Sequence, residues 1–97
     1  MTIVKINKKE KIIELSGHTS NPIVCHAISG LVDSVGSWLI ESVDAEVISS
    51  DNAYFKMMPG RKTLGSIEFY ENFFEFLIYS IDLIEKNNPG NIEIQEI

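Results

Sequence analysis

The segment from residue 64 to residue 86 constrains the fold of this chain more than any other feature. Apolar side chains recur there at helical spacing and share one face of a predicted helix: Leu64, Ile67, Tyr70, Phe74, Leu77, Ile81 and Ile84. Thr63 is the expected N-cap, and Asn88-Pro89-Gly90 ends the helix. Because such a helix is stabilised mainly by burial of its apolar face, the rest of the chain must supply a surface that covers it.

The same segment is rich in aromatic residues. Phe69, Phe73 and Phe76 lie beside the apolar face and leave only a narrow polar stripe opposite to it. The resulting apolar arc is wider than contact with a single sheet requires. It indicates either a dimer surface or a helix wedged between a sheet and another helix, and the pattern alone does not choose between the two.

The first part of the chain predicts a β-hairpin followed by a helix. Residues 2–7 and 11–17 alternate apolar and polar side chains around the polar run at residues 7–10. A helix is expected over residues 23–42, with one buried stripe. The apolar residues of that stripe are Val24, Ala27, Ile28, Leu31, Val35, Trp38 and Leu39.

A second hairpin and a last strand complete the predicted order. Residues 43–47 alternate apolar and acidic side chains, residues 49–52 read as a turn, and residues 53–58 form the next short strand. Ile92 and Ile94 mark the last strand. The predicted fold is α+β in the order ββαββαβ, with about five strands in a mixed or antiparallel sheet, two helices and one domain over residues 1–97.

Charge and composition narrow the function. The chain has 14 acidic and 8 basic side chains, a net charge of -6, which disfavours binding to nucleic acid or to anionic membranes and favours a basic partner. The N-terminal residues lack the apolar run of a signal peptide, and no apolar run reaches a spanning length of about 20 residues. We therefore expect a cytoplasmic protein without direct membrane contact. Its one cysteine is available as a free thiol.

The residues between the first hairpin and the first helix offer a possible catalytic pair. Asn21 or Ser20 is the expected N-cap and Pro22 suits the first helical position, so Cys25 falls in the first turn. There the helix dipole favours a thiolate, and unpaired N–H groups are available to an oxyanion. His18, seven positions earlier at a strand end, can fold back as general base.

Taken alone, these residues also fit a structural explanation. A single cysteine on a helix flank is most often a small buried hydrophobe, and a histidine in a turn usually bonds nearby backbone. His26 is expected to face solvent, and Ser29, one turn beyond Cys25, either bonds within the site or caps a carbonyl. His18, Cys25 and His26 are too few ligands for structural zinc, so we expect no metal and no other cofactor.

The surrounding motif resembles that of the ribosomal-processing cysteine proteases, the Prp family of bacteria. That motif is a Gly-His pair at a strand end, a flexible loop, and Asp-Ile-Val-Cys-Ala-Ala-Val-Ser at a helix start. Gly17-His18 match the pair, and the second part is matched in register by Ile23, Val24, Cys25, Ala27 and Ser29. The order of elements resembles the family along nearly the whole chain.

This resemblance implies a homodimeric cysteine endopeptidase that removes the N-terminal extension of a large-subunit ribosomal protein. Cys25 would be the nucleophile and His18 the general base, with Gly17, Ser20, Asn21 and Ser29 binding substrate or supporting the pair. Two differences from the family lie within the site: the loop from His18 to Cys25 is several residues shorter, and Pro22 replaces the Asp. They leave a second hypothesis, an impaired or inactive member that acts as a ribosome-associated binding protein.

Overall fold

A computed structural model of the chain describes residues 1–50 and 53–97 and has the predicted α+β order. Its elements are β1 (Thr2–Asn7), β2 (Ile12–Ser16), α1 (Pro22–Val43), β3 (Glu46–Ser50), β4 (Tyr54–Met58), the 3₁₀ helix η1 (Lys62–Ser66), α2 (Ile67–Asn87) and β5 (Ile92–Glu96). The turn expected at residues 49–52 is wrong for Ser49 and Ser50, which pair with β4 as the end of β3, and its residues 51 and 52 lie outside the described part. The order ββαββαβ is confirmed.

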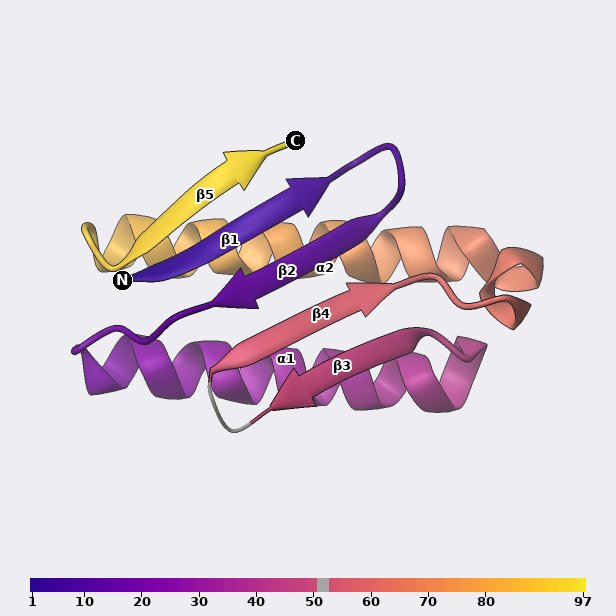
Figure 1. Ribbon diagram of the computed structural model, residues 1–97, viewed down its shortest axis with the longest axis horizontal. Helices are drawn as coiled ribbons and strands as arrows, with labels where there is room; N and C mark the ends of the chain where they lie inside the picture. Colours follow the sequence, from indigo (N-terminus) through magenta and orange to yellow (C-terminus); the bar gives the residue numbers. More distant parts are fainter. Residues whose placement is uncertain (51–52) are drawn as a thin grey trace.

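The strands form one five-stranded mixed sheet in the order β3-β4-β2-β1-β5. Three neighbouring pairs are antiparallel, and β1 pairs with β5 in parallel. Figure 1 shows α1 and α2 side by side behind the sheet, so that both helices cover the same face. In that view β3 is the edge strand lying over α1, and β5 is the opposite edge.

One hydrophobic core fills the space between the sheet and the two helices. Alternate strand residues point into it, as the period of two requires, and both helices bury one stripe. Its completely inaccessible side chains include Val4, Ile13, Val24, Leu39, Met57, Tyr70, Phe74 and Leu77. The expected burial of Tyr70, Phe74, Leu77 and Ile81 on α2 is confirmed.

The segments that join helices and strands differ from the prediction. Val43 is the last residue of α1, not the start of a strand, because its side chain continues the buried helical stripe and Asp44 closes the helix in the left-handed conformation, with φ of 55°. Thr63 does not cap α2. Its buried hydroxyl donates to the carbonyl of Val43 at 2.8 Å and accepts from the amide of Gly60 at 2.8 Å, so it ties η1 to the end of α1.

The predicted buried faces of both helices also differ from the structure. Leu64 belongs to η1, before α2 begins, and is 69% exposed. It is therefore not part of the buried stripe of α2. On α1, Ala27 and Trp38 are exposed, whereas Val32 and Val43 are buried. The helix therefore meets the sheet along a stripe rotated away from the predicted one.

The expectation that no segment reaches a membrane-spanning length is wrong for α1. This helix is long and apolar enough to cross a membrane by length and composition alone. The core helix of a globular domain passes the same test. Because Val24, Ile28 and Leu39 of α1 are buried in the core shared with the sheet, we assign the helix to the core.

Candidate active site

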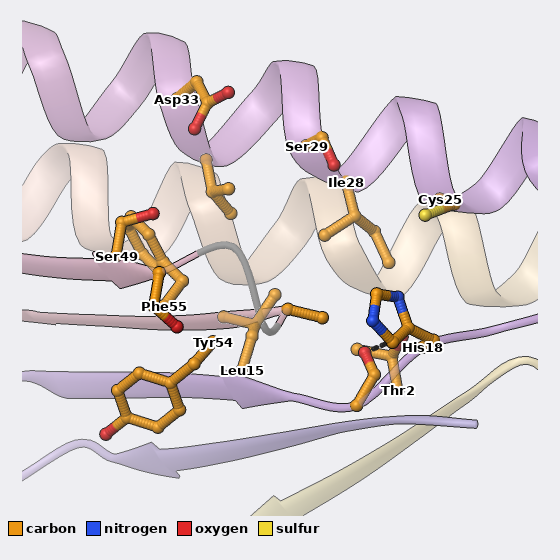
Figure 2. Close-up of a pocket in the computed structure, with 14 residues that line it drawn as sticks. Thr2, Leu15, His18, Cys25, Ile28, Ser29, Asp33, Ser49, Tyr54 and Phe55 are labelled. Carbon is orange, nitrogen blue, oxygen red and sulfur yellow. Dashed lines mark hydrogen bonds between the residues drawn. The ribbon is translucent and has the colours of Figure 1, made fainter.

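A cavity of about 330 Å³ opens between the first half of α1 and the nearby ends of the strands. Figure 2 shows His18 on the strand side of the cavity and Cys25 on α1 at its other side. Both side chains line the cavity, as do Gly17 and Ser29. The expected pair is therefore brought to one hollow from two different elements. The remaining lining residues include Thr2, Leu15, Ile28, Val32, Asp33, Ser49, Tyr54 and Phe55.

His18 is positioned by the backbone of Gly17. Gly17 has φ of +91°, which favours glycine, and a Cβ there would lie 2.7 Å from the carbonyl oxygen of Met1. Its N–H donates to the carbonyl of Ala53 at 3.1 Å, and its carbonyl accepts from the hydroxyl of Thr2 at 3.2 Å. These bonds hold the chain at the end of β2, so that His18 leaves the sheet in a defined direction.

Cys25 stands at the start of α1, as predicted, and its side chain is half-buried. Asn21 is the N-cap: its side-chain oxygen accepts from the amides of Ile23 at 3.0 Å and Val24 at 3.4 Å. Pro22 has no N–H, and the amide of Cys25 donates to the carbonyl of Asn21 at 3.0 Å. The expectation of unpaired first-turn donors for an oxyanion is therefore wrong, because the cap and the first helical bond occupy them.

The short loop between His18 and Cys25 is tied down at Thr19. The Thr19 hydroxyl donates to the side-chain oxygen of Asn91 at 2.7 Å and accepts from the amide of Asn21 at 3.3 Å. Ser20 is exposed. Neither Ser20 nor Asn21 lines the cavity, so Asn21 supports the site as a cap and Ser20 is not brought to it.

The cavity wall also holds polar side chains that the motif did not indicate: Thr2, Asp33, Ser49, Ser50 and Tyr54. Thr2 precedes the register pair of Ile3 and Ser16, so the hairpin pairing could have placed it beside Gly17. Asp33 is two helical turns from Cys25, which was a detectable signal. Ser49 reaches the cavity only through sheet order, which no local pattern gives.

Two further residues with titratable side chains are Tyr54 and His26. The hydroxyl of Tyr54 donates to a carboxylate oxygen of Glu14 at 2.6 Å, and this bond raises the pKa of Tyr54 above its ordinary value. His26 is exposed and is not part of the cavity lining, in agreement with the prediction. Within residues 1–50 and 53–97, no group of three or more His, Cys, Asp or Glu side chains is arranged to hold a metal ion.

Comparison with known proteins finds similar solved structures but no matching family model and no matching curated sequence. Among solved structures, the ribosomal processing protease Prp of Staphylococcus aureus is similar in two crystal structures, one with a substrate peptide and one with a covalently linked product peptide.

The structure with the substrate peptide superimposes with a TM-score of 0.84 at 16% sequence identity, and the one with the product peptide at 0.81 and 19%. Both alignments cover 100% of each chain. The protein SMU.848 of Streptococcus mutans superimposes at 0.72 with 22% identity, over 99% of this chain and 91% of that one. The chain therefore has the fold of the Prp protease along its whole length, as the sequence resemblance implied.

Proposed function

We propose that this chain is a cysteine endopeptidase of the Prp family that removes the N-terminal extension of a large-subunit ribosomal protein. The observation that carries the proposal is that His18 and Cys25 line the same cavity, within a fold shared with the ribosomal processing protease Prp. The two residues come from the end of β2 and the start of α1, which are the positions that the motif assigns to the catalytic pair.

In this reaction the imidazole of His18 accepts the thiol proton of Cys25, and the sulfur attacks the carbonyl carbon of the scissile bond. The tetrahedral oxyanion collapses and expels the amine, to which His18 returns the proton, leaving a thioester on Cys25. Water, deprotonated by His18, then hydrolyses the thioester and the thiolate regains its proton. For α1 to donate to the oxyanion, Asn21 must first release the amide of Ile23 or Val24.

The charge of the chain suits this substrate. A net charge of -6 attracts a basic ribosomal protein, and the reaction takes place in the cytoplasm, where such proteins are made. The proposal includes a homodimer. It is supported by aromatic side chains that remain exposed on the helix layer, with Phe69 39%, Phe76 51% and Trp38 50% accessible. No direct contact with nucleic acid or membrane is part of it.

A second candidate is a catalytically impaired relative that binds a ribosomal protein without cleaving it. The short loop, tied through Thr19 to Asn91, and the occupied amides of Ile23 and Val24 favour this candidate. Both features reduce the freedom of the site to adapt to a reacting carbonyl. The two candidates differ in one observable, cleavage of the extension.

The test is incubation with a peptide that spans the extension junction of the ribosomal protein from the same organism, followed by mass spectrometry. We expect one cleavage that is lost in Cys25→Ala and in His18→Ala. His26→Ala is the matched control, because this neighbouring histidine lies outside the cavity, and it should cleave normally. Absence of cleavage by the unaltered protein, or cleavage that survives both substitutions, refutes the enzyme. Binding of the uncleaved peptide would then favour the second candidate.

A further inference from the structure

The two edges of the sheet are protected differently. β5 carries Glu93 and Glu96, and Glu96 pairs with Lys8 at 3.3 Å, so charge discourages another strand from pairing there. β3, with the sequence EVISS, has one charge, at its first residue Glu46, and no proline. Ile48 in its middle is 51% exposed. Proteins normally protect an exposed edge strand against pairing with another chain. The unprotected edge of β3 is therefore a candidate binding site for an extended segment.

The free edge of β3 leads into the candidate active site. Its last two residues, Ser49 and Ser50, line the same cavity as His18 and Cys25. Figure 2 shows Ser49 across the cavity from the α1 turns that carry Ser29 and Asp33. A chain lying along β3 would therefore pass directly into the space between the strand ends and the helix.

The cavity wall formed by α1, opposite β3, leaves room for the main chain of a peptide that lies along β3. Ser29 and Asp33 of α1 line the cavity with short polar side chains, and Ile40, two turns beyond Asp33, is 45% exposed. Small side chains at Ser29, Ser49 and Ser50 leave room for a main chain. Asp33 takes part in neither of the salt bridges found among the described residues. Its carboxylate is available to a basic side chain.

We propose that the substrate segment next to the scissile bond binds as a sixth strand on the outer edge of β3, with a Lys or Arg side chain of that segment on Asp33. This inference rests on the proposed function and names its mode of substrate recognition. β3 has five residues and spans about 16 Å, so it can pair with about five residues of an extended peptide. Main-chain hydrogen bonds supply affinity, and Asp33 selects a basic residue.

The test uses the junction peptide with Cys25→Ala protein, which binds without turnover. Each peptide amide is N-methylated in turn and the Kd is measured. Because alternate residues of a strand point their N–H groups to opposite sides, we expect every second methyl group to weaken binding about five- to tenfold, with little effect between them. Weakening without this alternation overturns the proposal.

Hydrogen exchange then locates the added strand. Amides of residues 46–50 should exchange more slowly with peptide bound, and those of residues 92–96 on the other edge should not change. Protection of β5 instead overturns the assignment to β3. Asp33→Asn should weaken the unmodified peptide several-fold and remove the effect of replacing its basic residue by norleucine. An unchanged norleucine effect overturns the role of Asp33.

The outcomes also separate this inference from the proposed function. Cleavage of the unmodified peptide by the unaltered protein, without alternation in the N-methyl series, overturns the docking mode alone. Alternation and β3 protection without cleavage support the docking mode and overturn the endopeptidase.

Discussion

The hydroxyl of Thr19 donates a 2.7 Å hydrogen bond to the side-chain oxygen of Asn91, 72 positions later in the chain. Asn91 also receives the amide of Thr2 on its carbonyl at 3.0 Å and donates its own side-chain amide to the carbonyl of Asn88 at 2.9 Å. Asn91, the residue just before β5, thus fixes both the start of β1 and the loop that joins His18 to Cys25.

Removing this bond should loosen the loop. For Thr19→Val we expect a loss of about 1 kcal/mol in the free energy of unfolding, because the partner oxygen of Asn91 loses its donor. That corresponds to a fall of about 4–8 °C in Tm for a domain of this size. Hydrogen exchange of residues 18–25 should become faster. Thr19→Ser keeps the hydroxyl and should restore both values; equal effects of Val and Ser would contradict this role.

Gly17→Ala should displace His18. The new Cβ would meet the carbonyl oxygen of Met1 at 2.7 Å with φ at +91°, so we expect destabilisation of about 1–3 kcal/mol by chemical denaturation. Cleavage should fall further than the unfolded fraction explains. Gly30→Ala is the control: it lies in the interior of α1, its Cβ would have open space, and it should stabilise by about 0.5–1 kcal/mol. Normal cleavage by folded Gly17→Ala would refute the positioning.

If His18 acts as the base for Cys25, the reactivity of the Cys25 thiol should depend on His18 even without substrate. Cys25 is half-buried in an open cavity, and we expect iodoacetamide to label it in the native protein near neutral pH. His18→Ala should slow labelling several-fold, because the base that accepts the thiol proton is lost. His26→Ala should leave the rate unchanged. Mass spectrometry over time gives these rates, and a rate that does not depend on His18 would show that the two side chains do not act together.

The parts of the site that depend on neighbouring residues were predictable from the sequence. Asn21 caps α1 and Pro22 begins it because capping involves only the first turn of a helix, and this placed Cys25 correctly. The same local logic failed for the oxyanion donors. The cap that starts the helix also consumes its free amides, so the chemistry of Asn21 cancels the prediction made for Ile23 and Val24.

Features that depend on distant partners were not predictable. The Thr19–Asn91 bond exists only because β5 pairs with β1 in parallel, and Thr63 bonds the end of α1 rather than capping α2. Its position before an apolar periodic segment was a valid N-cap signal, but the buried carbonyl of Val43 competes for the hydroxyl. Periodicity identifies a buried face without saying which element covers it, which is also why the Phe-rich side of α2 allowed two explanations.

That Phe-rich side gives a prediction about assembly. We expect light scattering at micromolar concentration to give twice the chain mass of 10.9 kDa, and Phe76→Glu to give the monomer mass. Phe76 is 51% exposed, so the charge should disrupt the contact between copies while changing Tm little. Lys5→Glu on the helix-free sheet face is the control and should stay dimeric. A monomer mass for the unaltered protein would contradict the proposed dimer.

The buried phenol of Tyr70 predicts the alkaline limit of stability. It is inaccessible to solvent, its hydroxyl donates to the carbonyl of Lys11 at 2.6 Å, and burial raises its pKa above the ordinary 10. A raised folded-state pKa gives stability that is complete below pH 10 and is lost as pH rises above it, because only the unfolded chain ionises there. We expect Tyr70→Phe to be less stable at pH 8 by about 1 kcal/mol and to lose less stability above pH 10. If the difference in free energy of unfolding between the unaltered protein and Tyr70→Phe stays constant from pH 8 to pH 11, Tyr70 does not set this limit.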